Sequence, residues 1–242
     1  MSEKHSADQE PVVRSEKVFR RFTIGQRWEH WILFFSSIIL LLTGLPQKYR
    51  TTGWSQQILS TPERLELIQT IHHVAAVVLI LLALFHLGWA ITLMARRKLP
   101  GDILVNLHDF RDFGKMVAYL LFFRKTPPRF GKFSFEQKIT YWFVFFGAGI
   151  MIFSGLILWF PIAITHILPG SVIPAAKLTH STEAIVATIF ILIWHFFQVH
   201  LKRLNLSIFT GNLSEEDMRK YHALEYESLT GEKADHIGDG NS

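Results

Sequence analysis

Four apolar segments, each long enough to cross a lipid bilayer, constrain the fold of this chain more than any other feature. They run from Trp28 to Leu45, from Ile71 to Met94, from Ile139 to Phe160 and from Thr179 to Leu201. An α-helix rises about 1.5 Å per residue, so roughly 20 residues span a hydrocarbon core of about 30 Å. With 49% hydrophobic residues and a mean hydropathy of +0.23, the 242-residue chain is too apolar for a soluble domain. The sequence therefore predicts an all-α integral membrane protein built as a four-helix transmembrane bundle.

Positive charge is distributed unevenly among the loops, and this distribution predicts the orientation of the helices. Ten Lys and Arg residues lie between Ala95 and Lys138, whereas the loop between the third and fourth segments contains only Lys177. Cytoplasmic loops of membrane proteins are enriched in these residues. We therefore expect both termini and the long middle loop in the cytoplasm. The net charge of +5 reflects this topology and does not indicate a nucleic-acid partner.

The segments outside the bilayer are expected to form peripheral structure. Residues 1–16 are polar and mixed in charge, which predicts a disordered cytoplasmic N-terminus ahead of a membrane domain at residues 17–204. Asp109–Phe123 begins polar and ends apolar, as is typical of a helix lying on the membrane surface. Residues 205–242 are predicted to form a cytoplasmic tail, in which Ser214 precedes acidic residues and favours the start of a short helix.

An internal repeat relates the two halves of the membrane domain. In each half, a residue near the start of one helix lies fourteen positions before a glycine. The next helix carries one histidine near its start and another fourteen or fifteen residues later. The matching positions are His30 and Tyr141, Gly44 and Gly155, His72 and His180, and His86 and His195. This pattern predicts two helix hairpins of common design around a pseudo-twofold axis, and such repeats often place a site at their interface.

Histidines within and beside the apolar segments are the candidate functional residues. An ionisable side chain inside hydrocarbon is costly, so it marks a functional site by default. Six of these histidines, on three helices, are the candidates, and five of them occupy two depths about four turns apart. They are His72 and His180 at the outer helix ends, His30, His86 and His195 further in, and His200 near the cytoplasmic surface.

Two depths of histidine favour two stacked haems b over other cofactors. A zinc site requires clustered ligands at one depth, usually with cysteine or carboxylate. The chain contains no cysteine, which excludes thiolate iron–sulfur clusters and covalently attached c-type haem on this chain. Axial haem ligation needs single imidazoles on facing helices with small residues around the macrocycle. The repeat favours His86 with His195 as the inner ligand pair, and a third haem on the unused histidines is a further alternative.

Several motifs occur in the order expected for a known family. They are RWEHW from Arg27, TGLP from Thr43, IHHVAA from Ile71, FEQKITYW from Phe135, SGLILWFP from Ser154, HSTEA from His180 and WHFF from Trp194. Over Ser15–Glu227 the chain resembles the cytochrome b subunits of membrane formate dehydrogenases and Ni/Fe hydrogenases, most closely their bacterial cytochrome b/b6-domain branch. The resemblance implies a four-helix haem-b protein of a bacterial or archaeal cytoplasmic membrane. Such a protein would carry electrons between a quinone (menaquinone or ubiquinone) and an outer-facing redox partner.

The resemblance also implies ligands for the two haems. By position, His72 and His180 would hold the outer haem, and His30 and His195 the inner one. The resembled subunits need no histidine at the positions of His86 and His200. These two residues are therefore kept as alternative or third-haem ligands, with His86 as the rival of His30.

A quinone is implied beside the inner haem, at the start of the third helix. The polar residues of that stretch are Ser134, Glu136 and Gln137. Quinone chemistry moves protons as well as electrons, so a carboxylate is needed within reach, and Glu136 is the candidate. An ion pair between Glu136 and a neighbouring lysine is the structural alternative.

The expected partners follow from the same reasoning. Because the chain has no cysteine, the next redox centre must belong to an outer-side iron–sulfur or multihaem c-type subunit. Membrane lipid and quinone complete the expected partners, and quinone oxidation or reduction is the only chemistry expected on this chain. A proton-relaying transporter and a haem-free membrane anchor are the alternative functions.

Overall fold

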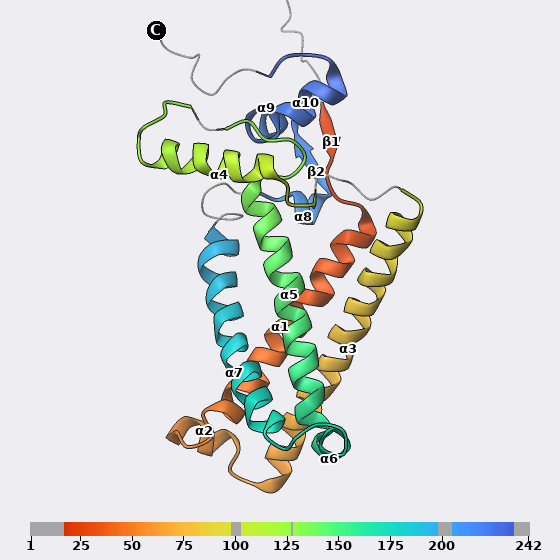
Figure 1. Ribbon diagram of the computed structural model, residues 1–242, viewed down its shortest axis with the longest axis vertical. Helices are drawn as coiled ribbons and strands as arrows, with labels where there is room; N and C mark the ends of the chain where they lie inside the picture. Colours follow the sequence, from red (N-terminus) through yellow and green to blue (C-terminus); the bar gives the residue numbers. More distant parts are fainter. Residues whose placement is uncertain (1–16, 98–102, 127, 198–204, 235–242) are drawn as a thin grey trace, which may run out of the picture.

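Four long helices dominate the structure, a computed structural model that describes residues 17–97, 103–126, 128–197 and 205–234 (Figure 1). They are α1 (Ile24–Lys48), α3 (Pro62–Ala95), α5 (Phe135–Trp159) and α7 (Val172–Phe190), the last continued by the π-helical turn η2 (Ile191–His195). All four are long and apolar enough to cross a membrane, with α7 and η2 forming one span. The predicted all-α transmembrane bundle is confirmed.

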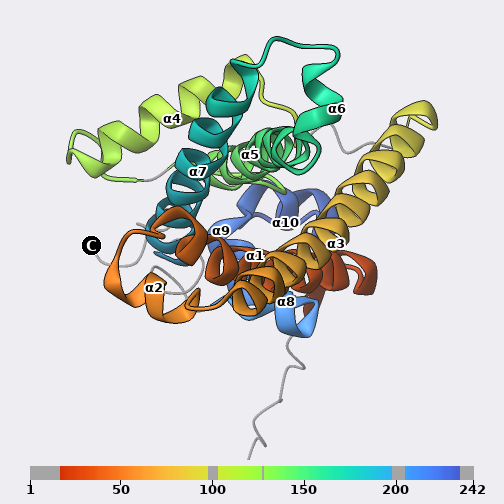
Figure 2. The same ribbon diagram turned by 90° about the horizontal axis from the view of Figure 1, so that it is seen from below.

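The long helices form two hairpins. Helix α1 packs along α3, and α5 packs along α7, as Figure 2 shows from one end of the bundle. Fewer contacts join α1 to α7 and α3 to α5. The short helices α2 (Gly53–Ile58) and α6 (Pro161–Thr165) lie in the connections within each hairpin, at the same end of the bundle (Figure 1).

Helix boundaries follow polar caps that lie outside the apolar segments. Thr23 and Ser134 each accept a hydrogen bond from a backbone N–H of the first turn, so α1 and α5 begin four residues before their apolar segments. The first helix was expected to end before Pro46, but it continues to Lys48. Proline removes only one backbone N–H, and so near the C-terminus the loss is a single hydrogen bond. The N–H of Tyr49, the residue just after the helix, still donates to Leu45 O at 3.0 Å.

A small cap, made from both ends of the described chain, covers one end of the bundle. Strand β1 (Val18–Arg20) pairs antiparallel with β2 (Asn212–Ser214), and Phe19 lies opposite Leu213. Helices α8 (Ser207–Thr210), α9 (Glu215–Tyr221) and α10 (Ala223–Thr230) complete the cap. Its buried hydrophobic residues are Leu213, Met218, Ala223, Tyr226 and Ala234.

The helix expected after Ser214 is present, because the Ser214 side chain accepts the N–H of Asp217 at 3.2 Å. The two strands were not predicted. Three-residue strands formed by chain segments so distant in sequence leave no periodic pattern to detect.

Helix α4 (Leu107–Leu120) lies across the capped end of the bundle (Figure 1). It matches the helix expected at Asp109–Phe123 but begins earlier, because Asn106 forms a capping box with Asp109. The Lys138 ammonium, in the first turn of α5, lies 2.8 Å from Asp109 Oδ1. This buried ion pair fixes α4 to α5. The position of α4 at the membrane surface stays a prediction.

The capped end also carries the basic segment between α3 and α5. By the positive-inside rule we expect this end to be cytoplasmic. The end with α2 and α6 is accordingly the expected outer end of the bundle.

Candidate functional site

His72 of α3 and His180 of α7 face each other near the outer end of the bundle and are called the outer pair. Their ring centroids lie 6.4 Å apart. Imidazole nitrogens bind metals at about 2 Å, which puts the centroids of two opposed rings roughly 6.3 Å apart. The observed separation therefore fits two axial ligands of one iron.

A hydroxyl group orients the His72 ring. Thr43 Oγ1 lies 2.8 Å from His72 Nδ1 and donates its own hydrogen to Ile39 O at 2.7 Å. Since the hydroxyl has one hydrogen, it accepts the Nδ1–H of the ring. The lone pair is then on Nε2, the nitrogen available to a metal.

The same arrangement recurs in the second hairpin. Ser154 Oγ lies 3.0 Å from His180 Nδ1 and donates to Ile150 O at 2.6 Å. The repeat therefore builds two candidate ligands of one chemical kind, each with its Nε2 free of a proton.

Glycines leave room for these two rings. A Cβ atom at Gly44 would lie 3.4 Å from His72 Cε1, and one at Gly155 would lie 3.1 Å from His180 Cε1. The repeated sequence pair of hydroxyl and glycine thus has two functions, orientation and space. The sequence showed the repeat, but the function of its hydroxyl required the contact across the helices.

His30 of α1 and His195 of η2 form the inner pair, nearer the cytoplasmic end. Their ring centroids also lie 6.4 Å apart, with the rings tilted by 37°. This pair joins the first hairpin to the second. It has the same separation as the outer pair and fits axial ligation in the same way.

The π-helical turn affects the direction of His195. His180 and His195 are fifteen residues apart, which on a regular α-helix places them about 60° apart in azimuth. In η2 the N–H of Phe196 bonds to Ile191 O, five residues back. This wider turn accommodates one extra residue without further rotation of the helix. The fifteen residues from His180 to His195 are therefore equivalent to the fourteen residues from His72 to His86 in the regular helix α3.

His86 has partners of a different kind. Its Nδ1 lies 2.7 Å from Glu29 Oε2, and its Nε2 lies 3.1 Å from the Tyr141 hydroxyl. Of the two candidates for pairing with His195, the structure brings His30 close and places His86 against residues of α1 and α5. His200 lies outside the described residues.

The residues expected around a quinone lie at the start of α5. Ser134 caps the helix, and Gln137 Oε1 accepts the Ser134 N–H at 3.1 Å and an Arg21 N–H at 3.4 Å. Glu136 lies between them in the first turn of the helix. The neighbouring Lys138 forms its buried ion pair with Asp109 of α4.

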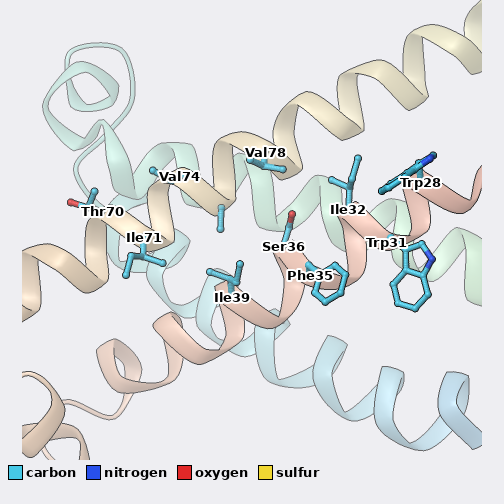
Figure 3. Close-up of a pocket in the computed structure, with 11 residues that line it drawn as sticks. Trp28, Trp31, Ile32, Phe35, Ser36, Ile39, Thr70, Ile71, Val74 and Val78 are labelled. Atoms are coloured by element: carbon cyan, nitrogen blue, oxygen red, sulfur yellow. The ribbon is translucent and has the colours of Figure 1, made fainter. Parts of the chain in front are cut away.

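An apolar cavity of about 510 Å³ lies between α1 and α3 (Figure 3). Its lining is apolar apart from two hydroxyl groups and two indole N–H groups, and it contains no histidine. The lining residues are Trp28, Trp31, Ile32, Phe35, Ser36, Ile39, Thr70, Ile71, Val74, Ala75 and Val78. The cavity suits a hydrocarbon chain and offers no metal ligand.

Comparison with known proteins gives consistent matches over most of the chain. The family described as prokaryotic cytochrome b561 matches residues 21–211, a range that includes both histidine pairs. The chain is also 23% identical over 214 residues to the formate dehydrogenase cytochrome b556(fdo) subunit of Escherichia coli strain K12, covering 86% of this chain and 92% of that protein. The proteins of the same description from Escherichia coli O6:H1 and O157:H7 give the same values.

Proposed function

The chain belongs to the prokaryotic cytochrome b561 family, and we propose that it binds two haems b, one between the histidines of each pair. As a member of this family it is a multi-pass bacterial membrane protein that acts as a b-type cytochrome in electron transfer. The observation that carries the proposal is the equal 6.4 Å separation of the outer and inner pairs.

The chain's own residues would hold both haems in a form suited to electron transfer. Each bound haem would supply a one-electron couple, and two axial imidazoles would leave no open iron position for a substrate. In the outer pair, Thr43 and Ser154 keep the Nδ1 protons in place and leave both Nε2 atoms available. The two pairs lie at different depths, so electrons would cross the membrane from one to the other.

We infer that the cytoplasmic half of the bundle exchanges electrons with a quinone. Oxidation of a quinol releases two electrons and two protons, and a haem accepts the electrons one at a time. Glu136 is the residue of that stretch proposed to handle protons, because its carboxyl group lies in the first turn of α5 and can take up and release a proton. We expect Glu136→Gln to slow quinol turnover and to leave both haem spectra intact; turnover at the wild-type rate would contradict this role.

A redox partner is proposed at the outer end, beside the outer pair. The curated relative is the cytochrome subunit of a formate dehydrogenase, so by analogy this chain would belong to a complex with catalytic redox subunits. Since the chain has no cysteine, the neighbouring centre would be an iron–sulfur cluster or a c-type haem of that partner.

The absorption spectrum of the purified protein tests the proposal. We expect a reduced b-type α-band and two haems per chain, with one haem lost in His72→Ala and the other in His30→Ala. The exposed histidine of α4 provides the control, since His108→Ala is expected to keep both haems. A protein without an α-band would be an anchor or transporter. Full haem content in His30→Ala would mean that His86, and not His30, pairs with His195 as the ligand of the inner haem.

A further inference from the structure

The hydrogen-bonded group formed by Glu29, His86 and Tyr141 is left unused by the two haem sites. We propose that this group, called the polar triad, is the binding site for a quinone head group. The inference rests on the proposed quinone function and names the residues that would contact the quinone. It assigns a role to a histidine that the haem sites do not need.

The internal repeat places the polar triad at the counterpart of the inner pair. His30 corresponds to Tyr141, and His195 corresponds to His86. The inner pair joins α1 to η2, the continuation of α7, and the contact between His86 and Tyr141 joins α3 to α5, the equivalent helices. The ring centroids of this second pair lie 6.1 Å apart, close to the 6.4 Å of the inner pair. The bundle therefore has two related inner positions with different side chains.

The second position is not suited to a metal. His86 Nε2 and the Tyr141 hydroxyl are 3.1 Å apart, the length of a direct hydrogen bond. A metal between two such ligands needs about 4 Å between the ligand atoms. Tyr141 occupies the position that His30 has in the other half of the repeat. The second position is therefore a hydrogen-bonded pair of side chains, whereas the first is a pair of imidazoles.

The directions of the hydrogen bonds define what this site recognises. The Glu29 carboxylate accepts the Nδ1–H of His86, which fixes the tautomer with a lone pair on Nε2. Nε2 then accepts the hydrogen of the Tyr141 hydroxyl. A ligand that enters this bond meets one donor, the phenol, and one acceptor, the imidazole. A quinone carbonyl accepts from the phenol, and a quinol hydroxyl donates to Nε2.

The surroundings favour a ligand that dissolves in lipid. All three residues belong to membrane-spanning helices, yet the His86 side chain is 37% exposed and that of Glu29 is 22% exposed. Leaving polar atoms exposed to hydrocarbon is costly, so a matching polar ligand would stabilise them. The Phe145 ring stacks on Tyr141, with centroids 6.3 Å apart, and adds an aromatic surface beside the phenol. An aromatic head group with carbonyl or hydroxyl oxygens meets these requirements.

The triad also lies next to a proposed electron acceptor. Glu29 immediately precedes His30 in α1. Among the residues that the structure describes, the titratable groups in contact with the His86 ring are Glu29 from α1 and Tyr141 from α5. A quinone bound here would therefore be adjacent to the inner pair.

Binding of menadione to the haem-loaded full chain tests the assignment without relying on turnover. We expect Tyr141→Phe and His86→Gln each to raise the dissociation constant of menadione at least tenfold, measured by titration calorimetry. The KM for menadiol should rise with it, while haem content and the dithionite-reduced spectrum stay unchanged. The matched controls Tyr49→Phe and His108→Gln should bind menadione as the wild type does.

The outcomes distinguish two claims: that the polar triad is the quinone site, and that the protein reacts with a quinone at all. Wild-type affinity in Tyr141→Phe and His86→Gln would overturn the site and leave the quinone function standing. A weakened affinity in Glu136→Gln alone would also overturn it, by moving the head group to the start of α5. If dithionite reduces the wild-type haems but menadione does not bind and menadiol does not reduce them, the quinone function itself fails. If His86→Gln loses haem, Tyr141→Phe decides, because it removes a single hydroxyl group.

Discussion

At the scale of single residues, the hydroxyl groups of Thr43 and Ser154 matter as much as the rings they contact. Each accepts the Nδ1–H of one histidine of the outer pair while donating to a carbonyl of its own helix. A hydrogen bond at Nδ1 makes an imidazole a stronger donor to a metal. Because the two sites are related by the repeat, both axial ligands of the outer haem would be strengthened in the same way.

Removing these hydroxyl groups should raise the midpoint potential of the outer haem. A net hydrogen bond contributes about 1 kcal/mol, and a tenfold change in a one-electron equilibrium is about 59 mV, so each of Thr43→Val and Ser154→Ala should add roughly 20–60 mV. The potential rises because the weakened imidazole stabilises ferric iron less. A spectroscopic redox titration measures the shift.

The matched control for this titration is Thr188→Val. The Thr188 hydroxyl donates to Ala184 O at 2.6 Å in the same helix as His180. Its loss should leave both haem potentials within about 10 mV of the wild type, since neither ligand changes. Equal potentials in the control, Thr43→Val and Ser154→Ala would mean that the hydroxyl groups only pack against the rings.

The residue scale also separates what sequence can foresee from what it cannot. The histidines stand out because they interrupt apolar segments, so their candidacy needs no structure. The orienting function of Thr43 and Ser154 depends on contacts between helices, and a hydroxyl in a transmembrane segment usually bonds only to its own backbone. The choice between His30 and His86 as the partner of His195 likewise depends on how the two hairpins pack.

At the scale of elements, the π-helical turn η2 accommodates the one extra residue between His180 and His195. Deleting Ile193 should convert η2 to a regular α-helical turn and shorten the spacing from His180 to His195 to the fourteen residues found in α3. His195 would still face His30, so we expect two haems per chain from the absorption spectrum. Deletion of Ile38 in the α-helical α1 should instead rotate His30 by about 100° relative to Thr43 and abolish one haem. Equal haem loss in both deletions would contradict this account of η2.

The ion pair between Asp109 and Lys138 joins α4 to the bundle, and its burial makes it sensitive to single changes. The two side chains are only 10% and 6% exposed. Lys138→Met leaves a buried carboxylate without its counter-charge and should destabilise the protein by about 3 kcal/mol. The double variant Asp109→Asn with Lys138→Met should recover most of that loss, because no charge is then buried. Thermal unfolding in detergent measures both, and additive losses would argue against a coupled pair.

At the scale of the whole molecule, hydropathy was sufficient to predict the bundle, but not the cap; the orientation expected from the charges stays a prediction. The four spans are continuous apolar segments, which sequence displays directly. The cap depends on pairing between Val18–Arg20 and Asn212–Ser214, near opposite ends of the chain. Its contacts, such as the ion pair of Arg21 with Glu225, join segments that no local pattern connects.

The cap should also be the part of the molecule most sensitive to acid. The Ala234 N–H, followed by the Arg129 guanidinium, lowers the pKa of Glu227 below its ordinary value. The Tyr226 hydroxyl, followed by the charge of Lys17, lowers the pKa of Glu232. Groups with a depressed folded pKa stabilise the fold above the unfolded pKa of about 4.3, and this contribution is lost as the pH falls through the folded pKa.

Acidification below about pH 4 should therefore loosen the cap while the four spans stay folded, because their stability depends on the hydrocarbon environment. Pepsin cleavage between β2 and α10, followed by mass spectrometry, measures the loosening against an unchanged helical circular dichroism. Glu227→Gln and Glu232→Gln should flatten the dependence of cleavage on pH, since neither amide titrates. The exposed Glu216 of α9 provides the matched control, and Glu216→Gln should retain the wild-type dependence. Were all three variants to behave alike, the acid sensitivity would have to come from groups outside the Glu227 and Glu232 contacts.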